Sequence, residues 1–123
     1  MVSFEELDLQ DGSPIYLQII RHVKQSIVAG NVQDGDEMPS RRVLSALLGV
    51  NPNTVQKAYR LLEEEAIIES RAGAKSYVVL DTGKVRRIRE ELLANDVQAI
   101  VSAMKGMGLS KREAISLVDK LWE

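Results

Sequence analysis

The sequence contains no cysteine, a single histidine and few aromatic residues, with one Trp, one Phe and three Tyr among 123 residues. Without cysteine there can be no disulfides and no thiolate metal sites. The lone His22 lies among apolar residues of a helical pattern, so nucleophile–base pairs of the usual kinds are nearly excluded. We therefore expect no catalytic residues, no metal and no cofactor, and a core built mainly from Leu, Ile, Val and Ala.

Long hydrophobic runs are also missing. No apolar segment approaches the length needed to cross a bilayer, and the acidic start MVSFEELDL lacks the layout of a secretory signal. A hydrophobic content of 45% with 28% charged residues is typical of a soluble globular protein, and the length suits one domain with a short appendage. We expect a cytoplasmic protein that has no membrane partner.

An excess of positive charge is missing too, because the formal net charge is −2. The basic residues are nevertheless clustered: Lys84, Arg86, Arg87 and Arg89 fall within six residues, while the front of the chain is acidic. These side chains form either a solvated helix face or a surface for flanking phosphates or an anionic ligand. A mildly acidic protein can still present a basic face to nucleic acid.

Apolar residues recur at helical spacing in three segments of the first half of the chain. Ser13 before Pro14 suits an N-cap followed by the first helical position, and Gly30 is a helix stop. Ser40 is the expected cap of the second helix. The expected helices run from Pro14 to Gly30, from Ser40 to Gly49 and from Asn51 to about Glu65, with Val50 buried in the turn between the last two.

A hairpin and two more helices follow. β-Branched residues flank a Gly-containing turn, which predicts strands at 67–71 and 76–80. A helical period returns from Lys84 to about Gly106, and Ser110 with Glu113 matches a capping box for a last helix. Helices this short cannot bury both apolar stripes alone. They should pack on the first unit, on a second copy, or both, and the predicted domains are residues 1–82 and 83–123.

The segment from Ser40 to Leu62 fits a helix-turn-helix, because the turn between its helices is short and contains Gly49. In such motifs the second helix lies in the major groove of DNA, and a hairpin directly after it makes a winged helix. The predicted fold class is therefore α+β and mainly α. It comprises a winged helix-turn-helix DNA-binding domain followed by a short two-helix dimerisation tail.

The third helix, VNPNTVQKAYRLL, has two faces. Val55, Ala58, Tyr59 and Leu62 share the apolar face, and the polar tip lies on the other side. Asn and Gln can pair with adenine, a Thr methyl can contact thymine, and Lys or Arg can contact phosphate. Capping and DNA contact are equally good interpretations of Asn51 and Pro52, whereas contact is favoured over plain surface for Thr54, Gln56 and Lys57.

Three stretches carry a resemblance to a known family: MPSRRVL at 38–44, LGVNPNTV at 48–55 and LLEEEAIIE at 61–69. In order and spacing they resemble the GntR family of bacterial transcription factors, over about Ser13 to Leu80. The NPNTV core and the short helical tail are similar to the YtrA-like subfamily. That resemblance implies a homodimer on a two-fold double-stranded DNA operator, usually acting as a repressor, with no large effector domain.

By position, Arg42 matches the family's DNA-contacting arginine in the second helix, and Gly73 matches the glycine at the wing tip. Asn51, Asn53, Thr54 and Gln56 match contacts of the recognition helix. The full set of expected DNA-binding residues is Ser40, Arg41, Arg42, Asn51, Pro52, Asn53, Thr54, Gln56, Lys57, Arg60, Arg71, Gly73 and Lys75.

The sequence departs from the family at four positions. Ala66 stands where glycine is usual, so the loop after the third helix is tighter or the helix is one residue longer. Lys75 replaces a second wing glycine and adds charge. Arg41 occupies a position that is usually acidic or aliphatic, and Val43 one that is often acidic. The run Glu63–Glu65 is interpreted as solvated surface that points away from DNA.

The tail is expected to form a dimer interface, because a tryptophan so near its end would be wasteful unless it is buried. The alternative is a small-molecule pocket, so an unidentified effector that rotates the dimer halves is a further expected partner. The residues that could form this pocket are Met104, Met107, Leu109, Val118, Leu121 and Trp122. A competing class for the whole chain is a winged-helix protein-interaction module without sequence-specific DNA binding. The expected dimerisation residues are Ile88, Leu92, Val97, Ile100, Met104, Val118, Leu121 and Trp122.

Overall fold

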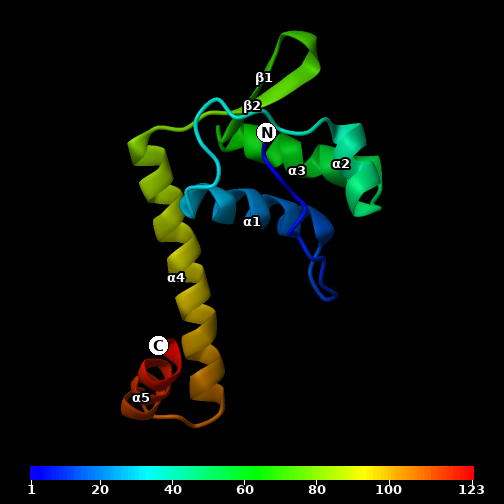
Figure 1. Ribbon diagram of the computed structural model, residues 1–123. Helices are drawn as coiled ribbons and strands as arrows, with labels where there is room; N and C mark the ends of the chain where they lie inside the picture. Colours follow the sequence, from blue (N-terminus) through cyan, green and yellow to red (C-terminus); the bar gives the residue numbers. More distant parts are fainter. The chain divides into compact units, whose positions relative to one another are not determined.

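The computed structural model describes residues 1–123, apart from the side chain of Ala74. The described chain is mainly helical with one antiparallel two-stranded sheet, as the fold class predicted (Figure 1). No helix among these residues is both long enough and apolar enough to cross a membrane. The elements are α1 (Ile15–Val28), α2 (Arg41–Leu48), α3 (Pro52–Glu64), β1 (Ile68–Arg71), a 3₁₀ turn (Ala72–Ala74), β2 (Lys75–Val78), α4 (Thr82–Gly106) and α5 (Lys111–Trp122).

The chain divides into two compact units, a first unit of Met1–Arg89 and a second unit of Glu90–Glu123. The sequence predicts a boundary between residues 82 and 83, just before the helix expected from Lys84. The structure places it inside α4 because the first turns of this helix belong to the first unit, where Ile88 is 3% exposed.

The core of the first unit lies mainly between α1 and α3. Ile19 and Val23 of α1 and Val55 and Leu62 of α3 are fully buried, as their helical spacing predicts. The segment before α1 also contributes to this core, which the sequence did not indicate. Its Phe4 is 2% exposed and packs against the His22 ring at a centroid distance of 4.9 Å, so the lone histidine has a structural environment.

The sheet is anchored to the loop that precedes α2. β1 and β2 are antiparallel, with Ile68 opposite Val78 and Ser70 opposite Ser76. The other edge of β2 binds the loop backbone, because Met38 donates to the Ser76 carbonyl at 2.8 Å. Figure 1 shows the hairpin projecting from the part of the first unit that α1, α2 and α3 form. The base of the wing is therefore held on both edges of β2.

The predicted helix caps are confirmed at α2 and α3 and displaced at α1. Ser40 Oγ accepts from the Val43 amide at 3.1 Å. At α1 the N-cap residue is Pro14 rather than Ser13, because the ψ of Pro14 is 137° and therefore not helical, and no side chain caps this end. The Ser13 carbonyl accepts from Gln18 Nε2. Val50 in the turn before α3 is half-buried rather than buried.

The second unit contains the end of α4 and all of α5. Its predicted capping box is present: Ser110 Oγ accepts from the Glu113 amide at 3.2 Å and Glu113 Oε1 accepts from the Ser110 amide at 3.1 Å. The bond that the Ser110 amide donates to the Glu113 carboxylate, followed by a contribution from the Ser110 hydroxyl, lowers the pKa of that carboxyl. No described side chain of this unit is buried, so the unit has helices but no core of its own.

Candidate nucleic-acid interface

The outer face of α3 is free of the core along its whole length. Asn53, Gln56, Lys57 and Arg60 are exposed and Thr54 is half-buried, while the opposite face of the same helix is fully buried. The predicted division into two faces is thus confirmed. The buried side chains fix the helix rotation, so they also fix which polar side chains point outward.

The N-terminus of α3 is capped by a side chain. Asn51 Oδ1 accepts from the Asn53 amide at 2.8 Å, and Pro52 occupies the first helical position. The cap uses one acceptor of Asn51, and the remaining amides of the first turn lie at the positive end of the helix dipole. Such a tip can bind a phosphate while the next side chains face base edges.

The two neighbouring arginines at the start of α2 have different environments. Arg42 is exposed and makes no ion pair in the part of the chain that the structure describes. Arg41 turns inward: its Nη2 lies 3.3 Å from Glu63 Oε1, and its guanidinium stacks 4.9 Å from the centre of the Tyr59 ring. Of the two predicted contacts, Arg42 is exposed, whereas Arg41 is half-buried in a contact between α2 and α3.

Two basic residues of α3 also have protein partners. Lys57 Nζ lies 4.0 Å from the centre of the Tyr16 ring on α1, and Arg60 Nε lies 4.0 Å from Glu64 Oε1 within the helix. Both side chains of the second pair are more than half exposed, so that pair is weak. Neither contact buries the cation, and both cations remain on the outer face.

The wing carries the remaining predicted contacts. Gly73 has φ 80° at its tip, a left-handed conformation that glycine adopts without strain. Arg71 is held beside the tip by Glu69 at 2.8 Å and by the Tyr77 ring at 4.6 Å. Lys75 is exposed and lies 3.9 Å from Glu37. The wing thus presents one cation before its tip, Arg71, and one after it, Lys75, while Gly73 at the tip has no side chain.

The acidic run at the end of α3 is solvated surface only in part, because Glu63 is half-buried. Glu63 accepts from Ser70 Oγ at 2.8 Å in addition to its contact with Arg41. Glu65 pairs with Lys24 of α1 at 3.0 Å. Glu64 and Glu65 are both exposed, as predicted, and Glu64 contacts Arg60 of its own helix. The missed signal was the residue spacing, which places three consecutive side chains on different sides of a helix end.

The connection from α3 to the wing is stabilised from α4. The helix does not extend beyond Glu65, and Ala66 has φ 59°, a strained value for a residue with a Cβ. Lys84 Nζ donates to the carbonyls of Ala66 and Val79. Lys84 is therefore a structural residue, separate in role from the exposed Arg86, Arg87 and Arg89.

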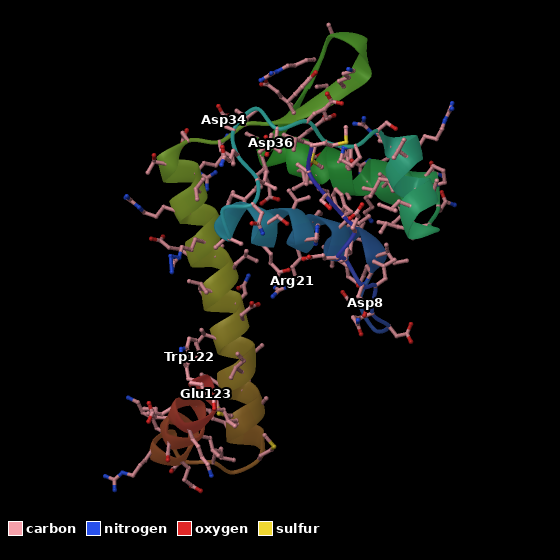
Figure 2. All side chains as sticks on the ribbon, viewed as in Figure 1. Asp8, Arg21, Asp34, Asp36, Trp122 and Glu123 are labelled. Atoms are coloured by element: carbon pink, nitrogen blue, oxygen red, sulfur yellow. The ribbon has the colours of Figure 1, made fainter. Side chains whose placement is uncertain are left out.

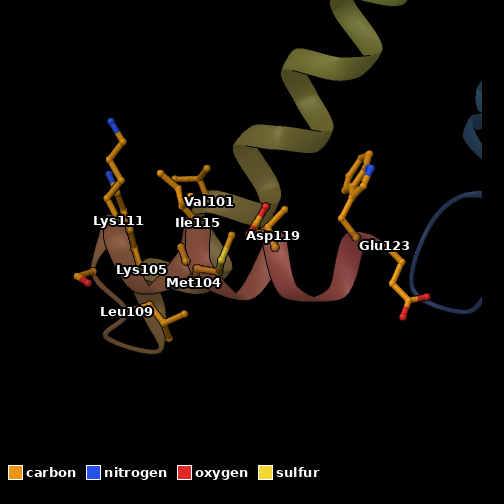
Figure 3. Close-up of a pocket in the computed structure, with 12 residues that line it drawn as sticks. Val101, Met104, Lys105, Leu109, Lys111, Ile115, Asp119 and Glu123 are labelled. Atoms are coloured by element: carbon orange, nitrogen blue, oxygen red, sulfur yellow. The ribbon is translucent and has the colours of Figure 1, made fainter.

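Most predicted dimerisation residues lie on exposed faces of the second unit. Val97 and Ile100 are both 54% exposed, and Trp122 is 81% exposed; Figure 2 shows Trp122 at the end of α5. Ile88 differs because it is buried in the first unit. Beside these faces is a cleft of about 820 Å³ between α4 and α5, lined by Val101, Met104, Leu109, Ile115, Val118 and Trp122 among others (Figure 3).

The chain is similar to known bacterial transcriptional regulators. The family described as bacterial regulatory proteins, gntR family, matches residues 15–78. The HTH-type transcriptional repressor YtrA of Bacillus subtilis is 40% identical over 93 residues, which cover 71% of this chain and 72% of that protein. The uncharacterized HTH-type transcriptional regulator YhcF of the same species is 32% identical over 114 residues, covering 93% and 94% of the two chains.

A solved structure gives the same result. A GntR family transcriptional regulator from Listeria monocytogenes superposes with a TM-score of 0.82 at 33% identity, covering 92% of this chain and 99% of that one. These relatives are transcriptional regulators, which are not enzymes. The family match spans α1, the helix-turn-helix and the wing described above. This chain belongs to the gntR family of bacterial regulatory proteins.

Proposed function

We propose that this DNA-binding transcriptional regulator is a cytoplasmic repressor that binds a two-fold operator as a homodimer. The observation that carries the proposal is the exposed polar tip of α3, held in one rotation by the fully buried Val55 and Tyr59. A helix fixed in this way can present Asn53, Thr54 and Gln56 to base edges in the major groove. The wing then reaches the adjacent groove with Arg71, Gly73 and Lys75.

The second unit supports a dimer. Its large apolar side chains are exposed in the single chain, including Val118 at 45% and Leu121 at 77%. Exposing so many apolar groups to water is unfavourable, at about 25 cal/mol per Å² of apolar surface, and burial against a second surface would remove that cost. We assign these faces and the neighbouring cleft to a second copy of the chain rather than to a small-molecule effector.

A protein-interaction module is the weaker alternative. A protein-binding surface has an apolar centre, whereas the outer face of α3 carries amide, hydroxyl and cationic groups. Those groups suit base edges and phosphates. The family membership argues in the same direction.

DNA contact is tested with a duplex that the protein selects from a random-sequence pool. Gln56→Ala should weaken binding by about 1–3 kcal/mol and relax preference at one base position. Arg42→Ala should weaken binding to all sequences and reduce the dependence of affinity on salt concentration, because a phosphate contact is lost. Affinity is measured by gel shift over a range of salt concentrations.

Gln25→Ala is the matched control, because Gln25 is an exposed glutamine on α1. It should leave affinity and base preference unchanged. If Arg42→Ala and Gln56→Ala also leave binding unchanged, the assigned interface is wrong. Repression is tested separately by placing the selected site over a reporter promoter, where expression should fall when the protein is present.

A further inference from the structure

The outer half of the wing is not fixed by apolar packing. Ile68 and Val78, the first pair in the register, are 2% and 0% exposed. The next pair on the same face is Ser70 opposite Ser76, since alternate residues of a strand share a face. Apolar side chains therefore pack at the base of the wing, whereas the next pair along the wing, Ser70 and Ser76, carries hydroxyl groups.

One carboxylate oxygen links this part of the wing to both helices of the helix-turn-helix. Glu63 Oε1 accepts from Ser70 Oγ of β1 at 2.8 Å and from Arg41 Nη2 of α2 at 3.3 Å. Glu63 lies before the left-handed Ala66 and Ser70 lies after it. The contact therefore spans Ala66, the left-handed residue between the end of α3 and the start of β1.

The other partner of Glu63 is itself firmly held. The Arg41 guanidinium lies over the ring of Tyr59, which is 0% exposed. The Tyr59 hydroxyl donates to the Pro39 carbonyl at 2.6 Å, just before α2. A chain of contacts thus runs from the buried core through Arg41 and Glu63 to Ser70 on the wing.

The neighbouring glutamates do not share this arrangement. Glu64 lies beside Arg60 on its own helix at 4.0 Å, and Glu65 pairs with Lys24 of α1 at 3.0 Å. Neither has a hydrogen bond or ion pair to the wing among the described residues. Position 63 is therefore distinguished by its contacts and not by its charge.

We infer that Glu63 is a positioning residue for DNA binding, which sets the direction of the wing relative to α3 through Ser70 and Arg41. It is not expected to touch DNA. The inference rests on the proposed function, in which α3 and the wing occupy neighbouring grooves. Both elements can bind at once only when the angle between them matches the separation of those grooves, so the loss of Glu63 should affect wing contacts before it affects α3 contacts.

The test compares Glu63→Ala with Glu64→Ala, which remove the same charge from adjacent positions. Hydroxyl-radical footprints are recorded on the selected duplex. Glu63→Ala should lose protection at the wing positions and keep protection at the α3 positions, and its affinity should fall about three-fold to ten-fold below that of Glu64→Ala. Glu63→Gln keeps an acceptor for Ser70 and should retain most of the wing protection.

Ser70→Ala provides a second variant if Glu63→Ala does not fold, as judged by its melting curve. It should weaken the same wing protection and leave the α3 protection intact. The inference is overturned if these variants give the wild-type footprint, or if Glu63→Ala and Glu64→Ala behave alike. Failure of the wild-type protein to protect any selected duplex would instead overturn the proposed function, so the two failures are distinguishable.

Discussion

The two units of the chain differ in where their apolar side chains lie. The first unit buries Ile19, Val55 and Leu62 completely, together with other residues from every helix it contains. The second unit has well-formed helices and a complete capping box, yet buries no described side chain. Local helix signals are equally good in both units, so they do not distinguish a folded unit from one that needs a partner.

The difference assigns separate tasks to the units. The first unit has what it needs to fold alone, and it carries every residue of the proposed DNA interface. The second unit has what it needs to associate, because its apolar faces gain burial only from another surface. Each of the following changes should affect one unit and spare the other.

Truncation after Arg89 should have the largest effect. The fragment keeps Ile88 and the rest of the first core, so it should remain folded, while the proposed dimer faces are lost. Affinity for a two-fold operator should fall by about a hundred-fold to ten-thousand-fold, because two linked contacts become one. Gel shift on duplexes with two half-sites and with one half-site measures this loss.

The duplex with a single half-site is the control, because the fragment and the full chain should bind it equally well. Sedimentation should show a monomer for the fragment and a dimer for the full chain. An unfolded fragment, or equal affinity of both proteins for the two-fold operator, would contradict the division of tasks.

Leucine-to-alanine substitutions in the two units should give opposite patterns. Leu62 is 0% exposed and Leu121 is 77% exposed. Leu62→Ala should lower the free energy of unfolding by about 2–5 kcal/mol, since it leaves a cavity in the first core. Leu121→Ala should change the unfolding of the first unit by less than about 0.5 kcal/mol and should instead weaken association.

Urea unfolding and sedimentation at several protein concentrations separate the two effects. Equal losses of stability from the two substitutions would mean that the second unit shares a core with the first.

Tyr59→Phe should have an intermediate effect confined to the first unit. It removes the hydrogen bond to the Pro39 carbonyl, at a cost of about 1 kcal/mol at neutral pH. Burial raises the pKa of the Tyr59 hydroxyl well above its ordinary value of 10.0, although nearby Arg41 opposes the shift. The folded state therefore holds its proton more tightly than the unfolded state, so stability is full below pH 10 and falls as the pH rises above it.

The wild-type protein should lose stability above that pH, and the Phe variant should lose less. Tyr16→Phe is the matched control, because it keeps the ring that Lys57 contacts and should behave as wild type. Parallel alkaline unfolding curves for the wild-type and Tyr59→Phe proteins would contradict the assignment.

Ala66→Gly should have the smallest effect and the opposite sign. Its φ of 59° is strained for alanine, and glycine relieves that strain while losing more entropy on folding. A net gain of about 0.5–1 kcal/mol in the free energy of unfolding is expected. Ala29→Gly, where φ is −73°, should give no gain, and denaturant midpoints of the two variants decide the matter.

Features of the fold could be predicted from the sequence wherever residues close together in the chain determine the structure. The two faces of α3, the Asn51 cap and the Ser110 capping box follow from spacing and side-chain chemistry within a few residues. The family motifs gave the order of helices and wing. The polar tip of α3, the centre of the candidate site, was visible for the same reason.

The sequence was insufficient where a contact joins residues far apart in the chain. Arg41 and Arg42 are chemically alike, and only packing against Tyr59 and Glu63 decides that the first turns inward. The burial of Phe4 depends on its contact with His22, and the role of Lys84 depends on the strained backbone at Ala66. None of these contacts leaves a periodic or local pattern.

The burial of Ile88 has a consequence for biosynthesis. A chain emerging from the ribosome usually folds domain by domain from its N-terminus, but the first core remains incomplete until the opening turns of α4 have been made. The Val2 amide donates to the Glu37 carbonyl at 2.9 Å, so this bond also forms only after residue 37 has been made. Nascent chains stalled before residue 88 should therefore be protease-sensitive, and resistance should develop once the first turns of α4 have left the ribosome.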